Sequence, residues 1–152
     1  SISLTGGEPL LQVDALKELI PKLPLPVFLE TNGTLASHMA EVADLVTYFS
    51  VDFKPGFETE FIDFIDILKD KKNVFVKFIV TKGIHVNELK KIAKIISSFN
   101  DEIPLILQPV TPFSGIKEKA TMDDILRAYN VLKSSLKTIR VIPQTHKLMN
   151  IP

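Results

Sequence analysis

Two kinds of hydrophobic pattern alternate along the chain. Short, mostly apolar runs rich in β-branched residues have the length of buried strands. Between them, apolar residues recur every three or four positions, which is the spacing of an amphipathic helix. The strand pattern covers Ile2–Thr5, Val27–Glu30, Val46–Phe53, Val74–Val80, Pro104–Pro109 and Thr138–Pro143. The helical pattern covers Leu10–Leu23, Thr34–Leu45, Thr59–Lys69, Val86–Phe99 and Thr121–Leu136.

The residues at the helix ends refine this prediction. We expect Thr34 to open the second helix and Thr121 to cap the last one, because a Thr oxygen accepts from a first-turn N–H. Asp123 and Asp124 favour the positive end of the last helix dipole. Residues 110–120 have no regular pattern and are expected to form a loop of the kind that is often functional or mobile.

Strands that alternate with helices of this length predict an α/β fold with parallel strands and right-handed crossovers. The length of 152 residues fits a single domain over residues 1–152. In such folds the chemistry gathers at the carboxyl ends of the strands. Polar and turn-forming residues follow all six predicted strands, in the stretches GGEP, ETNGT, VDFKP, VTKG, QPVTP and PQTHK.

Each of these stretches has a structural and a functional interpretation. Gly6–Gly7 either turns the chain or exposes backbone groups to a ligand, and Asn32–Gly33 is also a common turn pair. Asp52 and Lys54 point to one side of a strand, where they form an ion pair or hold a ligand. Lys77 lies within an apolar run, and its side chain either extends to the rim of the barrel or binds an anion.

The three histidines receive different predictions. His38 and His85 lie at helix or helix-entry positions and are expected on the surface. His146 lies in the polar cluster near the end of the chain and is the histidine expected to have a function.

Composition narrows the classes of function. The formal net charge of zero argues against a nucleic-acid partner, and no apolar run approaches the ~20 residues of a membrane helix. We therefore expect a cytoplasmic protein without nucleic-acid or membrane partners. The chain has no cysteine, so it provides neither a thiolate nucleophile nor a thiolate metal ligand, and we predict no metal site on it.

The stretches SLTGGEPLLQ, ETNGT, SVDFKP, VKFIVTKG and LQPVTP resemble the radical S-adenosylmethionine (SAM) superfamily. The ending VIPQTHKLMNIP is similar to the 7-carboxy-7-deazaguanine synthase family within it. This resemblance implies a partial (β/α)6 barrel with helices on its outer face. It also implies a radical ring contraction of 6-carboxytetrahydropterin in queuosine and archaeosine biosynthesis, with loss of ammonia. That reaction is of the carbon–nitrogen lyase class and uses SAM, a [4Fe–4S] cluster and Mg²⁺.

The resemblance also implies roles for single residues. The residues implied to bind SAM are Gly6, Gly7, Glu8, Thr31, Asn32, Asp52, Lys54, Lys77, Ile79, Gln108 and Thr111. The residues implied to contact the pterin-like substrate are Thr5, Gln144, His146 and Pro152.

The sequence departs from the superfamily at one place, because the CxxxCxxC cluster motif is absent. We therefore expect the chain to be the C-terminal part of such an enzyme, without the first strand and the cluster loop, and to be inactive as it stands. The full-length parent would use an external electron donor. The exposed edge of the strand at Ile2 predicts a homodimer.

Three other functions stay open. The first is another radical SAM activating enzyme, and the second is a non-catalytic module that binds a small molecule. The third is a different barrel enzyme, such as a Schiff-base aldolase that uses Lys54 or Lys77.

Overall fold

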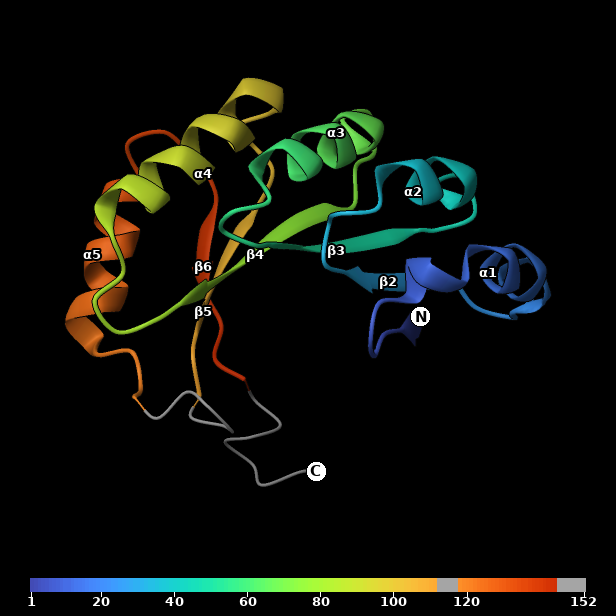
Figure 1. The fold of residues 1–152 in the computed structure, drawn as a ribbon, viewed down its shortest axis with the longest axis horizontal. Helices are drawn as coiled ribbons and strands as arrows, with labels where there is room; N and C mark the ends of the chain where they lie inside the picture. The colour runs from blue at the N-terminus through green and yellow to red at the C-terminus, as the bar shows by residue number, and fades with distance from the viewer. Residues whose placement is uncertain (112–117, 145–152) are drawn as a thin grey trace. The chain divides into compact units, whose positions relative to one another are not determined.

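A computed structural model describes residues 1–111 and 118–144 of the chain. Its parallel strands follow one another in the order β1 to β6 (Figure 1). The strands are β1 (Ile2–Leu4), β2 (Val27–Thr31), β3 (Tyr48–Phe53), β4 (Val74–Val80), β5 (Leu105–Pro109) and β6 (Ile139–Val141). The helices are α1 (Val13–Leu19), α2 (Ala36–Val42), α3 (Glu58–Leu68), α4 (Val86–Phe99) and α5 (Met122–Leu132), with 3₁₀ turns η1 (Pro9–Gln12) and η2 (Ile20–Lys22). The α/β class and the six predicted strands are confirmed.

The chain divides into two compact units, residues 1–76 and residues 77–152. The boundary lies inside β4, so that strand contributes residues to both units. The expectation of a single domain stays a prediction.

The first unit is built on the alternation of side chains along β2 and β3. In β2, Val27, Leu29 and Thr31 are buried, while the residues between them are half-buried. The register pairs Leu29 with Phe49 and Thr31 with Val51, so the buried side chains of the two strands form neighbouring rows. Helices α1, α2 and α3 pack against one another in chain order (Figure 1). Full burial of a side chain such as Phe49 contributes about 1.5–3 kcal/mol, so these rows stabilise the first unit.

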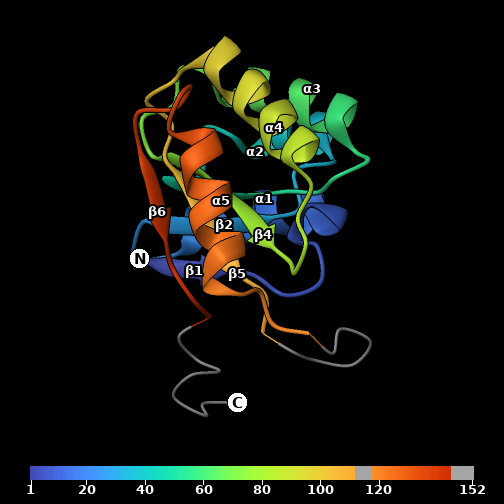
Figure 2. The ribbon, with the colours of Figure 1, turned by 90° about the vertical axis from the view of Figure 1, so that its left-hand side faces the viewer.

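The second unit pairs β5 with β6; α5 packs on both strands, and α4 packs on α5 (Figure 2). Helix α4 coincides with the predicted Val86–Phe99, because its apolar residues keep helical spacing over its whole length. Its buried side chains are Leu89, Ile92, Ala93 and Ile96. Helix α5 packs more lightly, with Ala128 and Leu132 as its buried apolar residues.

Local hydrogen bonds move several helix ends from the predicted positions. The prediction that Thr34 opens the second helix was wrong, because the cap position belongs to Leu35 and the Thr34 hydroxyl bonds to Asn32 instead. The predicted helix Leu10–Leu23 is α-helical only in its middle, with a proline in the 3₁₀ turn at each end. No helix in the described part of the chain is both long and apolar enough to cross a membrane.

The start of α5 confirms Thr121 as its cap. The Thr121 hydroxyl accepts from the Asp124 backbone N–H, and the Asp124 carboxylate accepts from the Thr121 backbone N–H at 2.9 Å, which completes a capping box. The other carboxylate oxygen accepts from the Gly83 N–H at 3.1 Å. Hydrogen bonds from Thr121, followed by the weaker one from Gly83, hold the pKa of the Asp124 carboxyl below its ordinary value of 3.8.

Replacement of Asp124 by Asn should lower the stability at neutral pH, because an amide nitrogen cannot accept these N–H groups. A depressed folded-state pKa stabilises the protein fully above the unfolded value of 3.8, and this stabilisation is lost as pH falls through the lower folded value. The difference in unfolding free energy between wild type and D124N should therefore narrow in acid. Urea titrations over a pH series measure it, and D123N, on the exposed neighbouring position, is the control. A difference independent of pH contradicts the prediction.

Candidate functional site

The loop after β1 contains two consecutive glycines in left-handed conformation. Gly6 has φ 92° and Gly7 has φ 58°, and a Cβ atom on either would meet nothing within 4 Å. The backbone conformation, and not crowding, therefore requires glycine at these positions. Thr5, Gly6 and Gly7 are all exposed, and Thr5 and Gly6 help to line a cavity of about 260 Å³ beside β1 and α1. Gly6 and Gly7 thus show both features that the sequence analysis considered: they turn the chain, and their backbone groups are exposed.

The Glu8 carboxylate connects this loop to the end of β2. One of its oxygens accepts from the Thr31 hydroxyl at 2.9 Å and from the Leu10 N–H at 3.1 Å. The other accepts from the Asn32 N–H at 2.7 Å. Both oxygens are therefore already bonded within the protein. Glu8, Thr31 and Asn32 were three separate site predictions, and one carboxylate brings them together.

The next turn, Asn32–Gly33–Thr34, is fixed by the Asn32 side chain. Its Oδ1 accepts from the Thr34 N–H at 3.0 Å and from the Thr34 hydroxyl at 2.6 Å, which is an Asx turn. Gly33 has φ 70°, and a Cβ there would lie 2.7 Å from the Val51 side chain. Unlike Gly6 and Gly7, Gly33 is thus required by conformation and by packing.

Asp52 and Lys54 form an ion pair at the end of β3. The Lys54 Nζ lies 3.2 Å from Asp52 Oδ2, and the side chains are 43% and 26% exposed, respectively. A pair this exposed contributes ~0–1 kcal/mol, so a charged ligand can replace either partner at little cost. The structural interpretation of this pair is confirmed, and its ligand-binding role stays a prediction.

The described site residues predicted in the second unit lie on β4, on β5 or just after it, and after β6. Lys77 and Ile79 are half-buried and lie on the face of β4 opposite to its buried residues. The Val110 N–H donates to the Val80 carbonyl at 2.9 Å, which joins the end of β4 to the residue before Thr111. Gln144 follows β6, and its buried side-chain oxygen has no hydrogen-bond partner among the described residues. His146 and Pro152 lie outside the described residues.

Two helix residues, His38 and Asp124, have contacts that the sequence analysis did not predict. His38 is half-buried, and its Nδ1 donates to the Leu10 carbonyl at 2.8 Å, so the prediction of a surface residue was wrong for His38. The bonded partner lies 28 residues away in sequence, and no local pattern announces it. His85 is exposed, as predicted. Asp124 was read only as a charge near a helix dipole, although the T-x-x-D spacing signals a capping box.

Two further facts concern metal ligands. Within residues 1–111 and 118–144, no three His, Asp or Glu side chains gather in a group that could hold a metal ion. The chain also has no cysteine anywhere in its sequence.

The chain is similar to several known enzymes, although no protein-family model matches it. It is 35% identical to the 7-carboxy-7-deazaguanine synthase of Geobacter sulfurreducens, over 98% of this chain and 62% of that protein. The enzyme of the same name from Thermococcus kodakarensis is 31% identical, with 99% and 63% covered. That of Methanothermobacter thermautotrophicus is 30% identical, with 99% and 70% covered. The chain thus spans less than two thirds of the first two relatives.

Replacement of Glu8 by Gln should destabilise the first unit. The amide puts an NH₂ group where one carboxylate oxygen now accepts, so at least one donor from Leu10, Thr31 or Asn32 loses its partner. Such a loss costs about 1–3 kcal/mol. Urea unfolding measures the change, and the exposed Glu18 on α1 provides the control E18Q. In E8Q, the Asn32 amide hydrogen should also exchange faster with solvent. Equal stabilities of E8Q and E18Q would show that the Glu8 carboxylate does not hold the two loops together.

Replacement of Gly33 by Ala should cost more than the same change at Gly56. Both residues have positive φ, 70° and 93°, but only at Gly33 does a Cβ meet the Val51 side chain. The shared conformational cost is about 1–2 kcal/mol, and overpacking adds about 1–3 kcal/mol at Gly33. The unfolding free energies of G33A and G56A test this prediction. Equal losses of stability in the two variants would show that the Val51 side chain moves aside.

Proposed function

The chain belongs to the 7-carboxy-7-deazaguanine synthase family, and we propose that it forms the SAM-binding and substrate-binding part of such an enzyme. The proposed reaction of the parent protein is the ring contraction of 6-carboxytetrahydropterin with loss of ammonia, which is carbon–nitrogen lyase chemistry. An external electron donor would serve this parent. The observation that carries the proposal is the glycine turn after β1, held by Glu8 against the end of β2.

The residues at the first-unit strand ends fit the chemistry of SAM. SAM carries an ammonium, a carboxylate and a sulfonium, so its site needs groups of both charges and open backbone. Gly6 and Gly7 provide exposed backbone that a ligand can approach without meeting a Cβ. We propose that the carbonyl oxygens of this turn accept from the ammonium group. When bound, SAM supplies the carbon-centred radical chemistry that the reaction requires.

Glu8 acts in this proposal as a positioning residue. Its carboxylate oxygens are engaged by Leu10, Thr31 and Asn32, so its contribution is to hold the glycine turn in register with the ETNGT turn. A ligand that contacts both turns then meets a preformed surface. Pre-organisation of this kind lowers the entropic cost of binding.

Asp52 and Lys54 are proposed to exchange their mutual ion pair for contacts with SAM. The Lys54 ammonium would meet the carboxylate of the ligand, and the Asp52 carboxylate would accept from ribose hydroxyls. A partly exposed ion pair contributes little to stability, so its loss on binding costs little free energy. In the second unit, we propose Lys77 as a further partner for an anionic group, and Ile79, Gln108 and Thr111 as contacts of the adenine.

The substrate contacts are proposed at Thr5, Gln144, His146 and Pro152. Gln144 has a supporting observation, because its buried side-chain oxygen has no partner among the described residues. A buried acceptor without a donor is costly, and a pterin ring offers N–H donors that would satisfy it.

The residues of this chain do not fit the [4Fe–4S] cluster that the family uses. A cluster needs thiolate ligands, and the sequence contains no cysteine. We therefore derive no step through the cluster, and we propose that this chain contributes binding and orientation alone.

Replacement of Lys54 by Met should weaken the binding of SAM to the chain by roughly tenfold, which corresponds to about 1.4 kcal/mol. Met keeps the length of the side chain but removes the charge that the ligand carboxylate would meet. Isothermal titration with SAM measures the change. The matched control is K69M, because Lys69 forms an ion pair of the same 3.2 Å length with Asp66 at an exposed place.

Equal affinities of K54M and K69M would remove Lys54 from the site. If the unmodified chain does not bind SAM at millimolar concentration, the proposed binding role fails. Conversion of 6-carboxytetrahydropterin by the anaerobically purified parent tests the reaction itself. A parent that cleaves SAM but leaves this pterin unchanged would favour another radical SAM activity.

A further inference from the structure

A hollow of about 490 Å³ lies between the end of α5 and the start of β6. Residues 133–140 line it, together with Tyr129 of α5 and Asp101. It lies at the amino end of β6, whereas Gln108 and Thr111 lie at the carboxyl end of β5, which runs parallel to β6. The hollow is therefore separate from the residues that we propose for SAM. Its volume lies within the ~300–1,000 Å³ that is typical of small-molecule sites.

The charged side chains of the hollow are mostly cationic. Lys133, Lys137 and Arg140 line it, and Asp101 is the acidic residue of its lining. Lys137 lies 3.1 Å from Asp101 and 3.5 Å from Glu102, so its charge is already neutralised. Within the part of the chain that the structure describes, Lys133 and Arg140 form no ion pair. The hollow thus has two cations available to an anionic ligand.

The C-terminal end of α5 also affects the charge of the hollow, because a helix end carries roughly half a negative charge. Its last carbonyl groups are already hydrogen-bonded. The Leu132 carbonyl accepts from the Ser135 N–H at 3.0 Å and from the Leu136 N–H at 3.1 Å. The Ser134 hydroxyl donates to the Val131 carbonyl at 2.9 Å. The two available cations therefore outweigh the partial charge of the helix end, and the hollow favours an anion.

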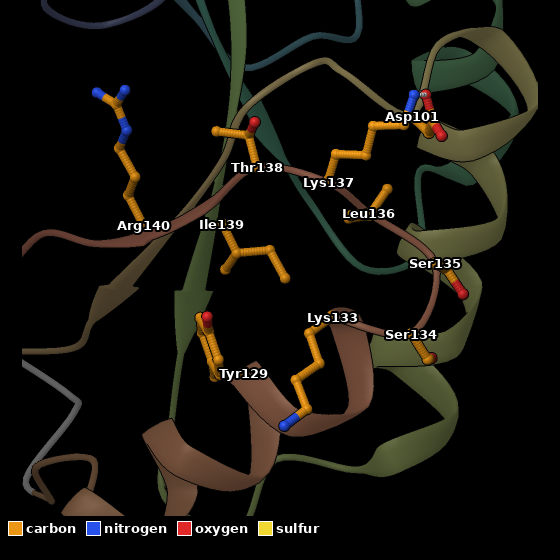
Figure 3. Close-up of a pocket in the computed structure, with 10 residues that line it drawn as sticks. All are labelled: Asp101, Tyr129, Lys133, Ser134, Ser135, Leu136, Lys137, Thr138, Ile139 and Arg140. Carbon is orange, nitrogen blue, oxygen red and sulfur yellow. Dashed lines mark ion pairs between the residues drawn. The ribbon is translucent and has the colours of Figure 1, made fainter.

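Part of the lining is apolar. Tyr129 is 39% exposed and lies four residues before Lys133, on the same face of α5. Figure 3 shows Tyr129, Lys133 and Ile139 around the hollow, while Lys137 points away from it toward Asp101. Ile139 is half-buried. An aromatic ring and a branched aliphatic side chain together offer an apolar surface on which a flat ring packs well.

We propose that this hollow binds a small phosphorylated molecule with a flat ring, of the class of the nucleoside monophosphates. The ring would pack against Tyr129 and Ile139, and the phosphate would meet the Lys133 ammonium. Arg140 is exposed at the next position of β6, and its guanidinium would turn to bind the phosphate through two N–H groups. This site is not part of the proposed function and does not depend on it.

Isothermal titration of the chain with UMP tests the proposal, and the pyrimidine of UMP separates this site from one that recognises the adenine of SAM. UMP should bind at millimolar concentration. Uridine and inorganic phosphate should each bind at least ~10-fold more weakly, because each offers one of the two recognised groups. The absence of binding by UMP, or an affinity for UMP no higher than for uridine or for inorganic phosphate, would overturn the proposal.

Two substitutions separate the contribution of the charge from that of the ring. K133M should weaken the binding of UMP at least ~10-fold, which is the loss of one charge-assisted contact. Y129L should weaken the binding of UMP and leave that of inorganic phosphate unchanged. The matched control is K94M, which removes the charge of an exposed lysine on α4 outside the hollow. Equal effects of K133M and K94M would show that UMP responds only to overall charge and would contradict the proposed site.

Backbone amide NMR signals locate the bound molecule. UMP should shift the signals of residues 133–140 and leave those of Gly6, Gly7 and Asn32 unchanged. Shifts confined to these three residues would place UMP at the loops proposed for SAM and would also overturn the proposal. Because SAM is absent from the titration, a failure of the chain to bind SAM leaves this test intact.

Discussion

The arrangement of the loops at the strand ends of the first unit depends on the hydrogen bonds that the Glu8 carboxylate accepts. Parallel pairing brings the ends of β1 and β2 to the same edge, but the ladder stops there and leaves backbone N–H groups without strand partners. Glu8 accepts two of them, from Leu10 and Asn32, and also the Thr31 hydroxyl. Gly6 and Gly7 have no side chain that could hold the turn, so its position against the end of β2 depends on Glu8.

In the second unit, the Asp124 carboxylate has the corresponding role and accepts backbone N–H groups from two loops. It accepts the Gly83 N–H from the loop after β4 and the Thr121 N–H at the start of α5. The Lys82–Glu118 ion pair, 3.0 Å long, joins the same two loops at the surface. Of the two links, the buried carboxylate has the larger effect, since exposed pairs contribute ~0–1 kcal/mol. In both units, one acidic side chain therefore positions a strand-end loop against its neighbour.

Sequence pattern was sufficient for what depends on local periodicity. The six strands and α4 follow from alternation and helical spacing, and Thr121 follows from its place before an apolar repeat. The start of α2 was misplaced because two local roles competed for Thr34, and the Asx turn with Asn32 prevailed. The roles of Glu8, His38 and Gly33 depend on partners 18 to 28 residues away, such as Leu10 for His38, so only the folded chain reveals them.

The composition of the chain separates two tasks that the proposed enzyme must combine. Binding of SAM calls for charges of both signs and open backbone, and the strand-end residues provide these. Radical generation calls for a cluster held by thiolates, and this chain has none to offer. Because the hydrogen bonds at Glu8 and the pair at Asp52 and Lys54 are formed without a cluster, affinity and turnover are separable quantities here. If this chain binds SAM as proposed, a change in its affinity for SAM would report on the strand-end loops without a contribution from redox chemistry.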